Sequence, residues 1–375
     1  MFDTKRTRLT KTLIIGILLA TLVLSGCAGA RGWPGTVSEG DTLYVSTMDG
    51  RAVALNPDNG SRKWDWEPSA GQSGQTASFL TCGAGSQIVG GKFYGAPAIA
   101  NGLVYVALHT GKVYAIDAAS GVQQWYYDLK STVSGGVAVG NNTVFIGSSN
   151  GKLSALDAGN GFLKWEFSSE NEVWATPVVV DGVVYFGSLD HSLYALNATD
   201  GTKKWAFKTG GGIASTPLVV EGVVFVGSLD NKFYAIDADA GTQKWVFEGA
   251  GNWFWSQAAY DNGTIYAGCL DHNVYAIDAG NGTTVWSKPF DAGSLVKASP
   301  VIAGGMLVVA SEVGKVYGLD LKTGEKKWEF DNIKSKVLSP LCATGSTVYI
   351  NTQDNKLYAL DGETGRQVWG VPLTK

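Results

Sequence analysis

A twelve-residue block that occurs eight times constrains the fold of this chain more than any other feature. One copy runs from Tyr234 to Trp245. Every copy follows the pattern Ala-x-Asp-x-x-x-Gly-x-x-x-Trp, with Asn56 and Asn197 in place of Asp and Gly318 in place of Ala. Consecutive closing tryptophans lie about 40 residues apart, a repeat length typical of the blades of a β-propeller, and only the first two are further apart. The copies end at Trp64, Trp125, Trp165, Trp205, Trp245, Trp286, Trp328 and Trp369.

The residue types of the block have local physical explanations. The alternating apolar run around Phe233 and Ala235 predicts a strand, because successive side chains of a strand point to opposite faces of the sheet. Asp237 predicts a turn, since its short carboxylate can accept hydrogen bonds from N–H groups two or three residues later. Gly241 suits a positive φ angle. Trp245 brings a large ring whose N–H needs a partner when buried, so we expect the eight tryptophans to lock neighbouring blades together.

Each repeat also contains enough strands for a complete blade. Residues 174–208 divide into four strands, at 175–180, 183–188, 192–197 and 202–207, with hairpin turns such as Asp181-Gly182. Eight such units fit into residues 33–375 without a leftover strand, so the last blade would close on the first by side-chain packing. The sequence therefore predicts an all-β fold, an eight-bladed β-propeller of four-stranded antiparallel blades. Seven blades with one stray repeat is the competing interpretation.

The N-terminal segment, residues 1–26, has the features of an export signal. Four basic residues lie between positions 5 and 11, and Leu13–Leu24 is an apolar core that is short for a membrane span. Leu24-Ser25-Gly26-Cys27 resembles a bacterial lipobox. We therefore predict a lipoprotein signal peptide at 1–26, lipidation at Cys27 and a short lipid-anchored tether at 27–32. An ordinary export signal with an incidental cysteine is the alternative.

Charge and the export signal together limit the partners. Removing residues 1–26 takes away four positive charges and Asp3, which changes the net charge from −4 to −4 − 4 + 1 = −7. An acidic surface disfavours nucleic acid as a partner. We expect a monomer held to the membrane only through its lipid. Its place would be the periplasmic face of the outer membrane or, in a host without one, the outer face of the cytoplasmic membrane.

One repeat is longer than the others. Pro68–Gly91 is rich in Gly, Ser, Gln and Thr and lengthens the second repeat by about 20 residues. The sequence predicts an inserted loop at 68–91. Loops carry function more often than strands do, so contact with a partner and the absence of any function both remain open for this segment.

A ring of residues is expected at one mouth of the central channel, where the innermost strand of each blade begins. The position three residues before Pro177, and its equivalents, hold Trp33, Tyr94, Ser134, Trp174, Ala214, Trp255, Lys297 and Val337, with Trp253 and Phe254 just ahead of Trp255. The aromatic members are candidates for binding a peptide, a sugar or a planar ligand, and Lys297 for binding an anion. The candidate binding residues are thus Trp33, Tyr94, Trp174, Trp255 and Lys297. The alternative is that these large side chains only fill the axis.

The sequence predicts no catalytic residue and no metal site. His109, His191 and His272 fall near turns, and the last two belong to repeats that are not neighbours, so they do not form a pair of metal ligands. Gly147-Ser-Ser-Asn-Gly151 matches the pattern of a nucleophile elbow, but it lies between two strands instead of between a strand and a helix. The chain contains no phosphate-binding loop and no dinucleotide fingerprint.

The Ala-x-Asp-x-x-x-Gly-x-x-x-Trp block resembles the tryptophan-docking repeat of pyrroloquinoline quinone (PQQ) propellers, and the resemblance covers nearly all of residues 33–375. One branch of these proteins, the quinoprotein dehydrogenases, holds a quinone and Ca²⁺ on the axis and typically has two adjacent cysteines and an aspartate base. This sequence has no adjacent cysteines and is shorter than those enzymes. The other branch is the BamB family of lipoprotein propellers, which help to insert β-barrel proteins into the outer membrane, and the lipobox and chain length are similar to that branch.

The resemblance to the BamB family implies a non-enzymatic, lipid-anchored scaffold that binds other envelope proteins, including a β-barrel assembly machine. It implies neither PQQ nor calcium as a cofactor. Two other functions remain as alternatives. One is a PQQ-dependent dehydrogenase, and the other is an extracytoplasmic sensor that binds a ligand at the aromatic mouth.

Overall fold

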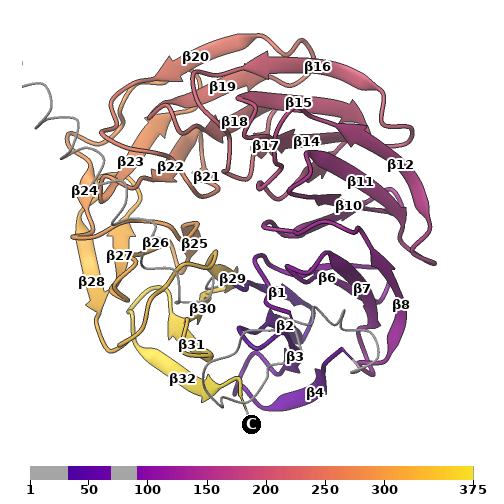
Figure 1. Cartoon of the computed structure of the whole chain (residues 1–375). Helices are drawn as coiled ribbons and strands as arrows, with labels where there is room; N and C mark the ends of the chain where they lie inside the picture. The colour runs from indigo at the N-terminus through magenta and orange to yellow at the C-terminus, as the bar shows by residue number, and fades with distance from the viewer. Residues whose placement is uncertain (1–32, 69–90, 375) are drawn as a thin grey trace, which may run out of the picture. The chain divides into compact units, whose positions relative to one another are not determined.

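The computed structural model describes residues 33–68 and 91–374. These residues form eight sheets of four antiparallel strands each, which follow one another around a ring from indigo to yellow in Figure 1. The prediction of an eight-bladed, all-β propeller is confirmed. The predicted signal peptide at 1–26, Cys27, the tether at 27–32 and residues 69–90 of the predicted insert lie outside the described residues.

In every blade the four strands are consecutive in sequence, and each pairs with the next. The strands of the first four blades are β1 (Thr36–Glu39), β2 (Thr42–Ser46), β3 (Ala52–Leu55), β4 (Arg62–Trp66), β5 (Ala98–Ala100), β6 (Leu103–Ala107), β7 (Lys112–Asp117), β8 (Gln123–Asp128), β9 (Val137–Gly140), β10 (Thr143–Gly147), β11 (Lys152–Asp157), β12 (Leu163–Ser168), β13 (Val178–Val180), β14 (Val183–Gly187), β15 (Ser192–Asn197) and β16 (Lys203–Lys208).

The strands of the last four blades are β17 (Leu218–Val220), β18 (Val223–Gly227), β19 (Phe233–Asp237), β20 (Gln243–Phe247), β21 (Ala259–Asp261), β22 (Thr264–Gly268), β23 (Asn273–Asp278), β24 (Phe290–Asp291), β25 (Val301–Ala303), β26 (Met306–Ala310), β27 (Val316–Asp320), β28 (Lys326–Phe330), β29 (Cys342–Thr344), β30 (Thr347–Asn351), β31 (Lys356–Asp361) and β32 (Gln367–Pro372). The described part of the chain has no helix long and apolar enough to cross a bilayer.

Burial follows the position of a strand within its blade. All five residues of β14 are buried, because neighbouring blades cover both faces of the two middle strands. The outermost strand β16 alternates between exposed and partly buried residues, since one of its faces meets solvent. The hydrophobic core therefore lies between the blades. One cluster, for example, joins Leu43 and Val53 of the first blade to Tyr349 and Leu357 of the last.

The tryptophan that closes each block contacts the next blade in two ways. Its indole N–H donates a hydrogen bond to a turn carbonyl, as from Trp205 to the Ala238 oxygen at 2.9 Å. Its ring packs against the glycine of the same turn, so that a Cβ on Gly241 would lie 2.5 Å from the Trp205 ring. The donor–acceptor pairs are Trp64–Ala118, Trp125–Ala158, Trp165–Ala198, Trp205–Ala238, Trp245–Ala279, Trp286–Leu321, Trp328–Gly362 and Trp369–Pro57.

The ring closes where β29 and β1 meet, and no strand of either blade enters the sheet of the other. Besides the Trp369 contact, the Met48 N–H donates to Asn355 Oδ1 at 2.7 Å, and Asn351 Nδ2 donates to the Ser46 carbonyl at 3.0 Å. The last and first blades are thus joined by side chains and by backbone–side-chain hydrogen bonds.

Candidate binding site at the channel mouth

The segment before each innermost strand positions the residues of the channel mouth. A fully buried residue anchors the segment, as Val173, Ile213, Phe254 and Val296 do, each with 0% of its surface exposed. The anchor's N–H is often bonded to the neighbouring turn, as from Val296 to the Cys269 carbonyl at 3.2 Å. The next residue turns toward the axis and is partly exposed. Trp174, Ala214, Trp255 and Lys297 occupy this position.

The sequence alignment of the mouth was wrong for the last blade. Val337 was expected at the mouth, but it is fully buried and is the anchor of its segment. The segment before Pro340 is one residue shorter than the equivalent segment before Pro300. Counting back from the proline therefore reaches the anchor, and the partly exposed residue of this blade is Leu338.

Four aromatic rings from different blades meet at the axis. The Trp33 ring centroid lies 4.8 Å from that of Tyr94 and 6.2 Å from that of Trp255. The Trp255 centroid is in turn 6.3 Å from that of Trp174. All three contacts are edge-to-face, an arrangement that aromatic quadrupoles favour. Since Trp33 belongs to the first blade and Trp255 precedes the sixth, their contact spans blades that are not neighbours.

Two members of this cluster, Tyr94 and Trp174, also contact other residues of the protein. Tyr94 is only 6% exposed, its ring lies 4.5 Å from that of His109, and burial raises the pKa of its hydroxyl. The Trp174 N–H donates a hydrogen bond to Glu172 Oε2. Both side chains thus have partners within the protein.

Beside the cluster lies a cavity of about 260 Å³, lined by Trp33, Trp253, Trp255, Leu270, Lys297 and Leu338. Five of the six lining side chains are aromatic or aliphatic. Trp253 is 42% exposed, while its backbone is held by a hydrogen bond from the Leu270 N–H to the Trp253 carbonyl at 2.9 Å. The cavity is therefore an apolar pocket with a single cationic side chain in its wall.

The cation of the pocket belongs to a cluster of three charges. Lys297 Nζ lies 2.9 Å from Glu312 Oε2, and Lys336 pairs with the other oxygen of the same carboxylate. Glu312 is only 9% exposed. Burial by itself would raise its pKa, but the two ammonium groups outweigh burial and hold the pKa below its ordinary value. The carboxylate stays ionised at neutral pH, so the cluster carries one net positive charge.

The structure thus brings together Trp33, Trp255 and Lys297 of the predicted set. Sequence reasoning did not assign Leu270, Leu338, Glu312 or Lys336 to the site. Leu270 lies in a turn, where apolar residues of other repeats occur as well, and Glu312 pairs with lysines on either side of it in sequence. Only Trp253, adjacent to Phe254 and Trp255, had a visible signal as part of an aromatic run.

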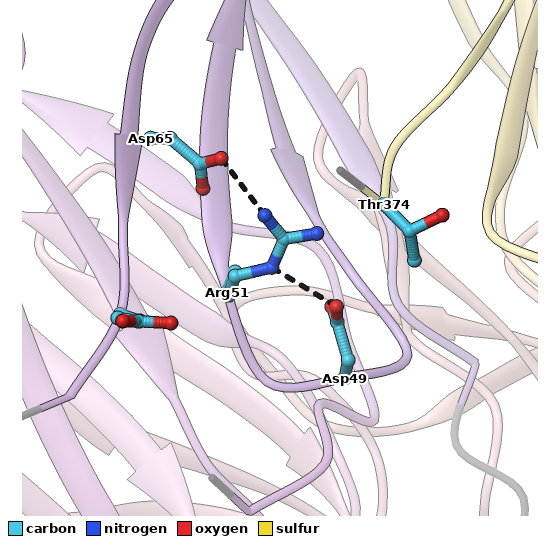
Figure 2. Close-up of a pocket in the computed structure, with 5 residues that line it drawn as sticks. Asp49, Arg51, Asp65 and Thr374 are labelled. Atoms are coloured by element: carbon cyan, nitrogen blue, oxygen red, sulfur yellow. Dashed lines mark hydrogen bonds and ion pairs between the residues drawn. The ribbon is translucent and has the colours of Figure 1, made fainter. Parts of the chain in front are cut away.

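A second cavity, of about 480 Å³, lies near the C-terminus and is lined by Asp49, Arg51, Asp65, Glu67 and Thr374. Figure 2 shows the Arg51 guanidinium between two carboxylates. Its Nε is 2.9 Å from Asp49 Oδ2 and its Nη1 is 2.8 Å from Asp65 Oδ2, while Nη2 donates to the Leu373 carbonyl at 2.8 Å. Each nitrogen of the guanidinium thus already has a partner within the protein. Because one partner, Leu373, follows the last blade, we interpret the residues of this cavity as part of the contact that closes the ring.

No group of three His, Cys, Asp or Glu side chains within residues 33–68 and 91–374 is arranged to hold a metal ion. His191 and His272 occupy turns with positive φ angles of 72° and 78°. Ser149, which holds the serine position of the nucleophile-elbow pattern, lies in the hairpin turn between β10 and β11, and its N–H donates a hydrogen bond to the Thr132 carbonyl at 2.9 Å.

A family model described as "Outer membrane protein assembly factor BamB" matches the chain at residues 109–215, 205–254 and 251–375, which is more than half of its length. A search of curated protein sequences gives no significant match.

Solved structures with the same fold include proteins of different kinds. BamB from Moraxella catarrhalis is 18% identical with a TM-score of 0.70, over 85% of this chain and 91% of that one. The computationally designed Ika8 protein is 15% identical with a TM-score of 0.73, over 88% and 97%. Quinohemoprotein alcohol dehydrogenase from Comamonas testosteroni is 15% identical with a TM-score of 0.65, over 75% and 67%. At these identities the likeness concerns the fold alone.

Proposed function

The chain belongs to the family of outer membrane protein assembly factor BamB, and we propose that it is a non-enzymatic scaffold that binds other cell-envelope proteins during outer-membrane protein assembly. The observation that carries this proposal is the family match, which runs through the repeats from residue 109 to residue 375. The rigid ring, whose blades are locked to one another by the docking tryptophans, suits a scaffold because it presents its connecting loops in fixed positions.

The proposed location follows from the N-terminal sequence. Leu24-Ser25-Gly26-Cys27 would direct cleavage before Cys27 and its lipidation, and the acyl chains would hold the protein at the periplasmic face of the outer membrane. In a host without an outer membrane the same anchor would hold it at the outer face of the cytoplasmic membrane. Binding of envelope proteins then takes place outside the cytoplasm.

The channel mouth offers a poor fit for calcium and a quinone. Trp33 and Trp255 meet on the axis, where the quinoproteins hold their cofactor. Calcium needs several oxygen ligands with negative charge, but the carboxylates near the mouth are already engaged. Glu172 accepts a hydrogen bond from Trp174, and Glu312 is neutralised by two lysines. This supports a protein that works without either cofactor.

The proposed function is tested on the full-length lipoprotein in its own host. We expect deletion of the gene to lower the amount of folded β-barrel protein in the outer membrane, measured by heat-modifiable mobility in gel electrophoresis. Reintroducing the wild-type gene should restore that amount, and Cys27→Ala should restore less. Crosslinking in intact cells followed by affinity purification should recover envelope proteins. Unchanged barrel proteins together with no recovered envelope protein would refute the proposal.

The quinoprotein fold of one structural relative justifies a second candidate function, a PQQ-dependent dehydrogenase. Purified protein mixed with PQQ and Ca²⁺ should show no saturable cofactor absorbance and no dye reduction that depends on alcohols or sugars. Saturable binding with turnover would favour the dehydrogenase over the scaffold.

A further inference from the structure

We propose that the pocket at the channel mouth is a binding site for a carboxylate that is attached to an aromatic or branched aliphatic group. The inference goes beyond the proposed function and does not depend on it, because a scaffold could bind its partners entirely through other loops. It rests on the size of the pocket, on the chemistry of its wall and on the charge beside it.

The size of the pocket selects a small group. Its volume of about 260 Å³ is slightly below the range of about 300–1,000 Å³ that is usual for sites of drug-sized ligands. Its walls are the indoles of Trp33, Trp253 and Trp255 and the side chains of Leu270 and Leu338. A pocket of this kind accommodates one aromatic ring or one branched aliphatic group, and burial of that group supplies the apolar part of the affinity.

The charge of the pocket selects the sign of the ligand. Faces of tryptophan rings attract cations, but the Lys297 ammonium in the same wall repels them. The Glu312 carboxylate is shared by Lys297 and Lys336, so this cluster of three side chains carries one net positive charge. An anionic group beside the apolar one would compensate that charge. A neutral sugar fits less well, because none of the six lining side chains offers a hydrogen-bond acceptor to the sugar's O–H groups and a neutral ligand would leave that charge uncompensated.

The indole N–H groups of the pocket point to the same conclusion. Each of the eight docking tryptophans donates its N–H to a carbonyl of the next blade, and Trp174 donates to Glu172. The N–H groups of Trp33, Trp253 and Trp255, in contrast, have no acceptor among the residues that the structure describes. Hydrogen-bond donors thus remain available at the mouth, which suits a ligand whose polar group is an acceptor.

Two sources can supply this chemistry, a small carboxylic acid and the C-terminal residue of a polypeptide. Isothermal titration calorimetry with four probes separates them: N-acetyl-phenylalanine, its amide, a pentapeptide that ends in phenylalanine with a free carboxylate, and the same peptide amidated. We expect a free acid to bind at least about tenfold more tightly than its amide. If only the pentapeptide with the free C-terminal carboxylate binds, the ligand is a polypeptide terminus. If this pentapeptide and N-acetyl-phenylalanine bind equally well, the ligand is a small carboxylic acid group and the pocket does not recognise the rest of a peptide. If no free acid binds, or if amides bind equally well, the proposal is wrong.

Variants assign the binding to this pocket. Lys297→Met keeps the apolar stem and removes the charge, so it should weaken binding of the free acid by about tenfold and leave the amide unaffected. Leu338→Glu places a second carboxylate in the wall and should abolish binding. The matched control is Lys152→Met, which removes a lysine that pairs with Glu166 on the outer strand of another blade and should change nothing. Circular dichroism of each variant checks that the fold is intact. Full binding by Lys297→Met would overturn the assignment.

Discussion

The docking tryptophan and the glycine beneath it form one contact made by two blades. Gly201 has a φ angle of +72°, and a Cβ there would lie 2.6 Å from the Trp165 ring. Two independent requirements, a left-handed backbone and a close approach of the ring, therefore act on one residue. The hairpin glycine Gly222 has nearly the same φ of +73°, but a Cβ there would have no other atom within 4 Å, so it meets only the first requirement.

The pair Gly201 and Gly222 separates these two requirements. Gly222→Ala should lower the free energy of unfolding by about 1 kcal/mol, the cost of a left-handed alanine. Gly201→Ala should cost about 2–4 kcal/mol, because the methyl group also displaces the Trp165 ring. Urea unfolding followed by circular dichroism measures both. Equal losses in the two variants would show that the tryptophan contact contributes little.

Glu312 gives the channel mouth a defined dependence on pH. Its pKa is lowered in the folded protein, because the two lysines outweigh the effect of burial. A lowered folded-state pKa contributes stability that is present above the ordinary carboxyl pKa of about 4.3 and is lost as the pH falls through the folded value. Glu312→Gln should therefore be less stable than the wild type at pH 7, and the difference should shrink below about pH 4.

The measurement is the urea midpoint of both proteins at pH 7, 5 and 3. Glu325→Gln is the control, because Glu325 is 70% exposed beside Lys327 and its replacement should have little effect at any of these pH values. A gap between wild type and Glu312→Gln that stays constant down to pH 3 would contradict the role of the two lysines.

Among the blade edges, the outermost strand of the sixth blade departs from the pattern. In the fifth blade, Phe233 pairs with Phe247, two residues after Trp245. In the sixth, Val274 pairs with Phe290, four residues after Trp286, so the strand carries two extra residues, and β24 is reduced to Phe290–Asp291. Pro289, which has no N–H, lies in this bulge. Trp286 nonetheless keeps its hydrogen bond to the Leu321 carbonyl at 3.0 Å, so docking between blades does not require a regular edge strand.

This irregular edge predicts uneven local stability around the ring. In native-state hydrogen exchange, the amides of residues 284–291 should exchange faster than those of β16, the complete edge strand of the fourth blade, because fewer of them are paired. Deleting Lys288 and Pro289 restores the spacing of the fifth blade and should slow exchange in this edge. Equal protection in the two wild-type edges would show that the bulge is as stable as a regular strand.

At the scale of the whole ring, the contact that closes it contains two arginines. Arg51 and Arg62 both donate to the Leu373 carbonyl, at 2.8 Å and 2.5 Å, and Asp65 pairs with both guanidinium groups. Leu373 itself is fully buried against the first and last blades. Because no strand crosses this boundary, the last residues of the chain act as the fastener.

Truncation tests this role of the C-terminus. Removing residues 373–375 should lower the free energy of unfolding by about 3 kcal/mol or more, since it deletes a buried leucine and the acceptor of two charged hydrogen bonds. Removing only 374–375 leaves Leu373 with a terminal carboxylate that the two arginines can still bind, so the loss should be small. Thermal unfolding compares the three proteins. A similar loss in both truncated proteins would show that Leu373 is not the fastener.

The parts of the fold that sequence predicted are those whose interactions recur at one period. The Asp237 turn closes within a few residues, since its carboxylate accepts from the Asp239 and Ala240 N–H groups. Trp205 reaches its partner one repeat later. The turn residue and the closing tryptophan each appear eight times, with the exceptions already named, so the number of blades could be predicted from the sequence. The mouth was predicted less well. The segment before Pro340 is one residue shorter than its equivalents in other blades, so counting back from the proline assigned Val337 to the mouth in place of Leu338. Such counting fails wherever a loop changes length.

The amino-acid sequence by itself therefore determined the strands of a blade, the number of blades and the contact of each blade with the next, because these depend on neighbours in the chain or on residues one repeat away. The pocket could not be predicted from it. Trp33 and Trp255 come from the first and the sixth repeats and meet across the axis, and Glu312 pairs with lysines before and after it that no repeat predicts. The contact between Trp33 and Trp255 exists only once the ring has closed, since closure alone brings blades that are distant in sequence to a common axis.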